Sequence, residues 1–136
     1  LQAIRNLNER AEARDLRIET HVEDFTKLRV SKGSLDLVVS IGVLEFASRE
    51  AVAAAVPTAY EALRPGGRAL LIFAADEDFR HEAASDLGIR KIDRQGVRDI
   101  LRSTTSTNFA IDQYITTYEN DTFRQVDWLL SLHKPD

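Results

Sequence analysis

The stretch GSLDLVVSIGVLEF, residues 33–46, decides the fold of this chain. Residues 35–40 are mostly apolar and do not alternate cleanly with polar side chains, which is typical of a strand covered on both faces, as in a parallel sheet. The strand leads into Ser40, Ile41 and Gly42, where an ordinary polar turn would be expected. Ligands of open α/β sheets lie beyond the carboxyl ends of the strands. A glycine at that point allows an unusual backbone angle or removes a clashing Cβ, although it also serves simply to ease a turn.

The elements that follow alternate between helix and strand. Residues 48–63 have a helical pattern, in which Pro57 is expected to introduce a kink or mark a new start. The sequence Arg-Pro-Gly-Gly at residues 64–67 ends this helix as a structural turn, and residues 68–74 form the next apolar strand. Two strands joined through a helix by short connections predict parallel neighbours with a right-handed crossover.

The two ends of the chain predict further elements. Residues 1–14 show apolar side chains at helical spacing, and residues 18–22 read as a short strand. A modest helix is expected over residues 93–102. Two β-rich runs, residues 109–118 and 122–132, are separated by a short polar gap, which predicts an antiparallel hairpin at the end of the chain.

Composition bounds the partners and the number of domains. The chain has 136 residues, of which 43% are hydrophobic, so it can form one domain, or part of one, with its own core. Its net charge of −4 and isoelectric point near 5.4 provide no broad cationic surface for a phosphate backbone. We therefore expect a small-molecule substrate and neither nucleic acid nor a membrane as partner. The oligomeric state cannot be read from the sequence.

Three further features of the sequence add to this picture. There is no cysteine, so disulfides and thiolate chemistry are excluded, and a cytoplasmic location is expected. No apolar run approaches the roughly 20 residues that cross a bilayer. There is no methionine, and the chain opens inside a helical pattern, so we expect further residues upstream.

The segments DLVVSIGVLEF and, one helix later, LRPGGRALLIF together resemble the class I S-adenosylmethionine-dependent methyltransferases. Within that family, the small-molecule branch of tellurite and thiopurine methyltransferase-like proteins is the most similar. The resemblance covers nearly the whole chain and implies an α/β fold. That fold is a Rossmann-like methyltransferase sheet, mostly parallel, with a C-terminal antiparallel hairpin.

The departure from the family concerns its N-terminal part. The glycine-rich turn after the first strand and the acidic residue ending the second strand are absent. Residues 1–136 would then be the C-terminal portion of a single domain that lacks its first strand, first helix and second strand. The family's strand order, 3-2-1-4-5-7-6, leaves a gap between residues 18–22 and 35–40. We expect upstream residues or another chain to fill it.

The resemblance also implies cofactor contacts. Asp24 would accept a hydrogen bond from the adenine amino group, and Phe25 would offer its backbone amide or ring edge to the same base. Ser40, Ile41 and Gly42 would lie beside the methionine part of S-adenosylmethionine. The alternatives are a solvated loop aspartate at position 24 and a core phenylalanine at position 25.

The candidates for substrate contact follow Gly42 along the chain. Glu45 and Phe46 belong to the loop that faces the transferred methyl group in this family. No catalytic side chain is expected, because methyl transfer depends mainly on the placement of the acceptor. His21, His81 and His133 lack the spacing of metal ligands, so no metal site is expected.

The function implied is S-adenosylmethionine-dependent methyl transfer to a small-molecule nucleophile, carried out as part of a longer chain. One alternative is a non-catalytic methyltransferase-like module for binding or assembly. A nicotinamide-dependent oxidoreductase is a third class, which the C-terminal hairpin disfavours. A glycine-rich turn and an acidic strand end in the upstream sequence would favour the enzyme over the module.

Overall fold

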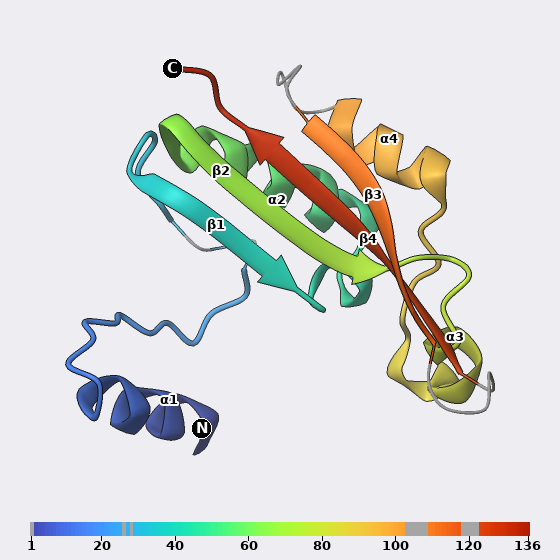
Figure 1. Cartoon of the computed structure of the whole chain (residues 1–136), viewed down its shortest axis with the longest axis horizontal. Helices are drawn as coiled ribbons and strands as arrows, with labels where there is room; N and C mark the ends of the chain where they lie inside the picture. The colour runs from blue at the N-terminus through green and yellow to red at the C-terminus, as the bar shows by residue number, and fades with distance from the viewer. Residues whose placement is uncertain (1, 26, 28, 103–108, 118–122) are drawn as a thin grey trace.

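The computed structural model describes residues 2–25, 27, 29–102, 109–117 and 123–136. In chain order the helices and strands are α1 (Gln2–Glu12), β1 (Leu35–Ile41), η1 (Leu44–Phe46), α2 (Arg49–Ala62), β2 (Leu63–Ala74), α3 (Arg80–Ala83), η2 (Ser85–Leu87), α4 (Arg94–Arg102), β3 (Phe109–Thr117) and β4 (Arg124–His133) (Figure 1). The strands form one mixed sheet in the order β1-β2-β4-β3.

The sheet has the expected topology. Strands β1 and β2 are parallel, with Ile41 opposite Ile72, and helix α2 crosses between them. Strand β4 is antiparallel to both β2 and β3, so the C-terminal hairpin adds to the edge of the sheet. The predicted parallel pair and the predicted hairpin are both confirmed. The polar gap expected between the two hairpin strands, residues 119–121, lies outside the described residues.

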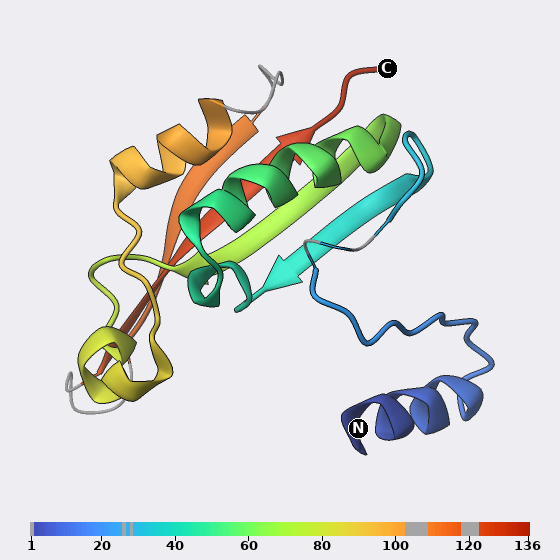
Figure 2. The same ribbon diagram turned by 180° about the vertical axis from the view of Figure 1, so that it is seen from behind.

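Helices α2 and α4 cover one face of the sheet (Figure 2). The core lies between them and the strands, and its largest fully buried side chains include those of Trp128, Phe73, Leu63 and Leu130. Trp128 also donates its indole N–H to the carbonyl of Ile92 at 2.6 Å, which ties the segment before α4 to strand β4. A buried tryptophan that uses its N–H in this way satisfies its one polar group within the core.

The connection between α2 and β2 explains the paired glycines. Helix α2 begins after Ser48, whose hydroxyl accepts from the amide of Ala51 at 3.1 Å, and it contains Pro57. Gly66 has φ +75°, and a Cβ on Gly67 would lie 2.8 Å from a backbone oxygen. The expected separate turn at residues 64–67 is wrong: these residues lie inside β2, which starts at Leu63, and the register between β1 and β2 is irregular there.

The predicted strand at residues 18–22 is wrong. These residues form no regular element, and Ile18 and Val22 are exposed to 43% and 63%. A strand needs a neighbour for its backbone hydrogen bonds, and no described strand lies beside this segment. Figures 1 and 2 show the segment, with α1, lying apart from the sheet. The predicted helix at residues 1–14 is confirmed as α1.

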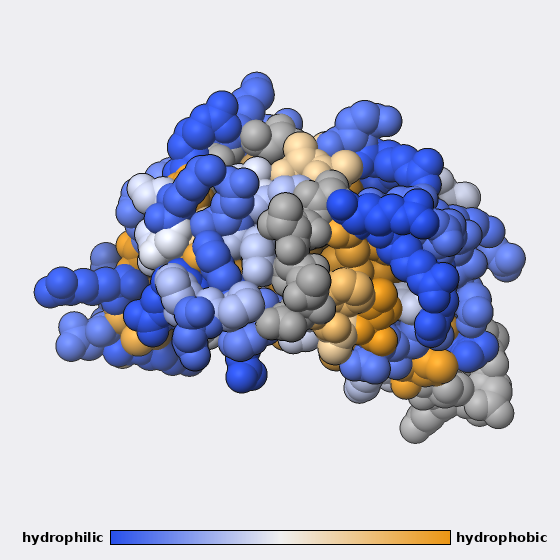
Figure 3. Space-filling view, turned by 90° about the horizontal axis from the view of Figure 1, so that it is seen from above, coloured by the Kyte–Doolittle hydropathy of each residue, from blue (hydrophilic) through white to orange (hydrophobic). Residues whose placement is uncertain are grey.

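Strand β1 forms the other edge of the sheet and is incompletely covered. Among the described residues, β2 is its one strand partner. On the face opposite α2, the side chains of Leu37, Val39 and Ile41 are each more than half exposed. Apolar side chains also reach the surface between hydrophilic ones in the view from above (Figure 3). No described helix is long and apolar enough to span a bilayer.

Candidate functional site

The carboxyl ends of β1 and β2 lie side by side. The amide of Gly42 donates to the carbonyl of Ile72 at 2.9 Å, so the ladder continues one residue beyond β1. Gly42 has φ +65°, and a Cβ built there would meet only one atom within 4 Å, Oε1 of Glu45 at 3.9 Å. The glycine is therefore required by its left-handed backbone and not by crowding within the chain. It turns the chain sharply and leaves its surroundings open.

A hollow of about 620 Å³ lies along this edge of the sheet, between β1, α2 and the segment around Phe25 and Val30. Three of the predicted cofactor-contact residues, Phe25, Ser40 and Ile41, line it together. Phe25 is also partly buried against the hydrophobic core, which agrees with the alternative that it is a core phenylalanine. The lining is mainly apolar and includes small side chains of α2.

Asp24 lies next to this hollow along the chain but does not line it. Its side chain is exposed, and its carbonyl accepts a hydrogen bond from the amide of Lys27 at 2.8 Å. This local turn follows the segment that was predicted as a strand. The assignment of Asp24 to adenine therefore stays a prediction.

The two predicted substrate-contact residues have opposite surroundings. Phe46 is 53% exposed, whereas Glu45 is only 1% exposed. Glu45 Oε1 faces Nη1 of Arg80 at 4.0 Å, and its Oε2 is buried without a hydrogen-bond partner among the described residues. Burial raises the pKa of Glu45, although backbone amides and the charge of Arg80 oppose that rise.

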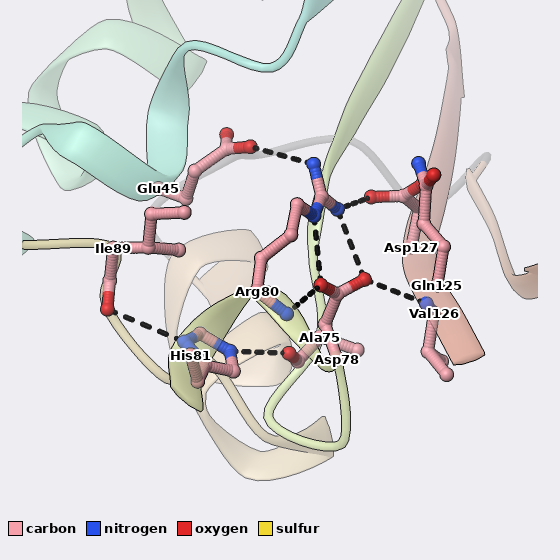
Figure 4. A network of polar contacts seen from close by, with 9 residues as sticks. All are labelled: Glu45, Ala75, Asp78, Arg80, His81, Ile89, Gln125, Val126 and Asp127. Atoms are coloured by element: carbon pink, nitrogen blue, oxygen red, sulfur yellow. Dashed lines mark hydrogen bonds and ion pairs between the residues drawn. The ribbon is translucent and has the colours of Figure 1, made fainter. Parts of the chain in front are cut away.

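Arg80 is the centre of a polar cluster at the end of β2 (Figure 4). Its Nε and Nη2 donate to the two carboxylate oxygens of Asp78 at 2.7 and 3.0 Å, and Nη2 also donates to Asp127 at 2.5 Å. Asp78 accepts a further hydrogen bond from the amide of Val126 at 2.7 Å. The cluster thus joins the loop after β2 to the start of β4.

The charges in this cluster stabilise one another. The hydrogen bond to Asp78, together with the bond and charge of Asp127, raises the pKa of Arg80 above its ordinary value despite burial. Burial alone would raise the pKa of Asp78, but the hydrogen bonds from Arg80 and from the backbone outweigh it and hold that pKa below its ordinary value. Arg80 and Asp78 are therefore both ionised at neutral pH.

Sequence reasoning missed this cluster. The only local signal was the charged run Asp76 to Glu82, which looks like a solvated loop. Asp78 and Arg80 are buried or half-buried because the loop folds back over β4, and Asp127 is more than 40 residues away along the chain. No spacing rule links residues so far apart.

His81, in the short helix α3, has a structural role. His81 Nε2 lies 2.6 Å from the carbonyl of Ala75, and its Nδ1 lies 3.3 Å from the carbonyl of Ile89. These contacts join α3 to the residue that follows β2 and to the segment before α4. In the part of the chain that the structure describes, no group of acidic and histidine side chains could hold a metal ion.

The comparisons with known proteins identify the class of fold. Residues 1–67 match the family model of a methyltransferase domain. Solved structures of S-adenosylmethionine-dependent methyltransferases share the fold over most of the chain. The chain therefore has the Rossmann-like fold of these methyltransferases.

The chain is 33% identical, over 103 residues, to the mouse (Mus musculus) tRNA (carboxymethyluridine(34)-5-O)-methyltransferase ALKBH8; the match spans 74% of this chain and 15% of that protein. A methyltransferase from Methanosarcina mazei is 15% identical with a TM-score of 0.67, covering 98% of this chain and 78% of that one. Phosphoethanolamine N-methyltransferase 2 from Haemonchus contortus, in complex with phosphomonomethylethanolamine and S-adenosylhomocysteine, is 11% identical with a TM-score of 0.62, covering 83% and 36%.

These matches support the methyltransferase resemblance at the level of the class. The finer assignment to the tellurite and thiopurine branch stays a prediction. The expected exclusion of nucleic acid also stays untested, because the curated relative is named for its action on tRNA.

Proposed function

We propose that this chain is the C-terminal portion of an S-adenosylmethionine-dependent methyltransferase domain. One observation carries the proposal: Gly42 adopts a left-handed conformation at the joined carboxyl ends of β1 and β2, beside open space. Ligands of open α/β sheets bind at this edge. The matches to a methyltransferase domain and to a complex with S-adenosylhomocysteine support S-adenosylmethionine as the cofactor.

The proposed cofactor contacts lie along this edge. The adenine would lie near Asp24 and Phe25, and the methionine portion would lie near Ser40, Ile41 and Gly42. The common lining of one hollow by Phe25, Ser40 and Ile41 supports this arrangement. Its volume is within the range of small-molecule sites.

The chemistry of the hollow fits only part of the cofactor. Its apolar lining suits a flat base beside Phe25, but it offers few polar groups for a ribose, an ammonium or a carboxylate. Those groups would need donors and acceptors from elsewhere in the whole protein. We therefore propose that residues outside this chain complete the site.

The edge of β1 that no described strand covers supports the same proposal. A bare strand edge leaves backbone groups unpaired, and the neighbouring side chains Leu37, Val39 and Ile41 remain exposed. An added parallel strand would pair with that edge and direct side chains into the hollow. In the whole protein we expect such a strand, from the same polypeptide or from another chain.

Methyl transfer makes few demands on protein side chains. The bound cofactor supplies an electrophilic methyl group, so the protein has to hold the acceptor in line and exclude water. Phe46, half-exposed just beyond the cofactor edge, is proposed to cover the acceptor. Glu45, from the same turn, is proposed to act on the substrate side of the site.

Two classes of acceptor have support. The acidic composition favours a small-molecule nucleophile, because the chain lacks a broad cationic surface. The identity to a tRNA methyltransferase favours a uridine derivative in tRNA. In that case the cationic surface would belong to other parts of the protein.

A transfer assay distinguishes these candidates. The whole protein is incubated with methyl-labelled S-adenosylmethionine and either total tRNA or an RNA-free small-molecule extract from the same cells. Label in only one fraction identifies the class of acceptor. Cofactor binding without transfer to either fraction would favour the non-catalytic module, and the absence of cofactor binding would overturn the proposed function.

A further inference from the structure

A second hollow, of about 160 Å³, lies where α2 and α4 begin, on the face of the sheet that both helices cover (Figure 2). Arg49 and Val52, at the start of α2, line one side, and residues 90–93, Gly96 and Ile100 line the other. The space is too small for a whole ligand of drug size. It suits a single small group, and its lining is more polar than that of the hollow beside β1.

The lining of this second hollow is basic. Arg49, Arg90 and Lys91 contribute to it, and Asp93 is the only acidic residue in the described lining. The Asp93 carboxylate already accepts a hydrogen bond from the amide of Gly96 at 2.7 Å. Residues 89–102 carry five basic and two acidic side chains, although the whole chain has a net charge of −4. The hollow therefore attracts anions.

The guanidinium of Arg90 has donors to spare. Its Nη2 makes one long hydrogen bond, to the carbonyl of Leu44 at 3.4 Å, and its Nε is buried with no hydrogen-bond partner among the described residues. Burial lowers the pKa of Arg90; the charge of Glu50 opposes this effect and that of Arg49 adds to it. A buried donor without an acceptor calls for a bound ion or water molecule beside it.

The other two basic side chains are only weakly held. Arg49 is mostly exposed, and its Nη2 lies 3.5 Å from Oδ2 of Asp99, which also accepts from Arg102 at 3.0 Å. Lys91 is exposed and forms no ion pair with another described residue. Both side chains can turn toward a ligand in the hollow without the loss of a strong contact.

Arg90 connects this hollow to the turn that follows β1. Its amide donates to the carbonyl of Glu45 at 3.0 Å, in addition to the bond from its guanidinium to Leu44. The next residue along that turn is Phe46, which is proposed above to cover the methyl acceptor. A group bound in the hollow would therefore lie next to the proposed acceptor side of the site.

We propose, on the basis of the function proposed above, that this hollow binds the phosphate monoester group of a small-molecule acceptor through Arg49, Arg90 and Lys91. Such a group carries a charge of roughly −1.5 to −2 at pH 7 and offers three acceptor oxygens. Three cations around one small space match that charge better than the single charge of a carboxylate or of an RNA phosphodiester. Arginine forks and lysine ammonium groups are common donors to phosphate.

The first test titrates inorganic phosphate into the whole protein and follows arginine Nε–H and backbone amide signals by NMR. We expect the shifts to concentrate at residues 49 and 90–96. Lys91→Gln should weaken phosphate binding about threefold to tenfold, because it removes one of three charges and no contact within the fold. Arg90→Gln should weaken it about tenfold or more, since a charged fork and its desolvated donors are lost together.

The matched control is Arg98→Gln. It removes an exposed charge of the same sign from α4, at a position that does not line the hollow. Its phosphate affinity should stay within about twofold of the wild type in physiological salt, where distant exposed charges are largely screened.

The second test asks whether the phosphate belongs to the acceptor. Methyl transfer to the RNA-free small-molecule extract is measured before and after phosphatase treatment of that extract. We expect treatment to abolish most of the transfer, and inorganic phosphate to compete with the untreated extract. Lys91→Gln should raise the extract concentration that gives half-maximal transfer about threefold to tenfold, with an unchanged affinity for S-adenosylhomocysteine.

The outcomes separate the two proposals. If S-adenosylhomocysteine binds but phosphate does not, or if Arg98→Gln weakens phosphate binding as much as Lys91→Gln, the phosphate site is refuted while the proposed function stands. Transfer that resists phosphatase, or transfer to tRNA alone, refutes the phosphate monoester acceptor. If the folded whole protein does not bind S-adenosylhomocysteine, the proposed function fails, and the acceptor role of the hollow fails with it.

Discussion

Residues 2–34 and residues 35–136 differ in how their apolar side chains are used. The first part has one helix, α1, and a long irregular segment in which Leu16, Ile18 and Val22 are more than 40% exposed. The second part forms a sheet with two helices on one face and a core that includes Trp128. Both parts carry apolar patterns, but among the described residues the large apolar side chains that are buried all lie in the second part. Burial therefore depends on neighbours as well as on local pattern.

The largest expected effect concerns residues 35–136, which contain the hydrophobic core. Trp128→Ala should lower the free energy of unfolding by about 3–5 kcal/mol, because it removes a fully buried ring and a hydrogen bond to Ile92. Leu16→Ala should change it by less than about 0.5 kcal/mol. Urea unfolding followed by fluorescence or circular dichroism measures both. A similar loss at Leu16 would show that the N-terminal segment is packed against something.

The second prediction compares two glycines, one in residues 2–34 and one in residues 35–136. Gly42 and Gly33 have φ values of +65° and +66°, and neither would crowd a Cβ closely. Valine at either position should cost at least about 1–2 kcal/mol of stability through backbone strain. Only Gly42→Val should also weaken S-adenosylhomocysteine binding, on the order of tenfold or more. Equal effects on binding would remove Gly42 from the site.

A third prediction asks whether the N-terminal part contributes to the site. Asp24→Ala should weaken cofactor binding by about 1–3 kcal/mol, the usual effect of removing one partner from a buried polar contact. Glu23→Ala, at an exposed neighbouring position, is the control and should bind normally. Calorimetric titration of the whole protein compares the two. Unchanged binding by Asp24→Ala would leave the adenine without its proposed acceptor.

The smallest expected effect concerns the pH dependence of stability. Because the pKa of folded Glu45 is raised, its protonated form favours folding, and that stability is lost as pH rises through the raised pKa. Glu45→Gln should therefore be at least as stable as the wild type near neutral pH, with the difference vanishing in acid. Asp78→Asn should behave in the opposite sense. Because the pKa of folded Asp78 is lowered, its ionised form stabilises the fold at pH values above the ordinary pKa of aspartate, and that stability is lost as the pH falls through the lowered pKa. Thermal unfolding between pH 4 and 8 would contradict this account if both variants changed in the same direction.

Much of the sheet could be predicted because its signals are local. The unalternating run at residues 35–40 and the helical pattern at residues 48–63 each depend on residues close in sequence. The strand expected at residues 18–22 failed because its pairing depends on a neighbour that the described chain does not provide. A β-rich pattern predicts the capacity to pair, not the presence of a partner.

The candidate site divides in the same way. The sequence indicated Ser40, Ile41 and Gly42 through the abrupt end of a buried strand, and Phe25 through resemblance. It did not indicate that Glu45 would be buried against Arg80, because that contact depends on a loop folding back over β4. Charged residues in a loop are ordinarily solvated, so only the three-dimensional structure distinguishes this cluster.

The most direct test of the central claim is calorimetric titration of S-adenosylhomocysteine into two samples, the whole protein and the chain of residues 1–136. We expect binding to the whole protein, which Gly42→Val weakens. Weak or no binding is expected for residues 1–136, because the described lining of the hollow beside β1 offers few polar groups for a ribose and an amino acid. Tight binding by residues 1–136 alone would refute the proposal that other residues complete the site. No binding by the folded whole protein would refute the assignment of this edge as a cofactor site.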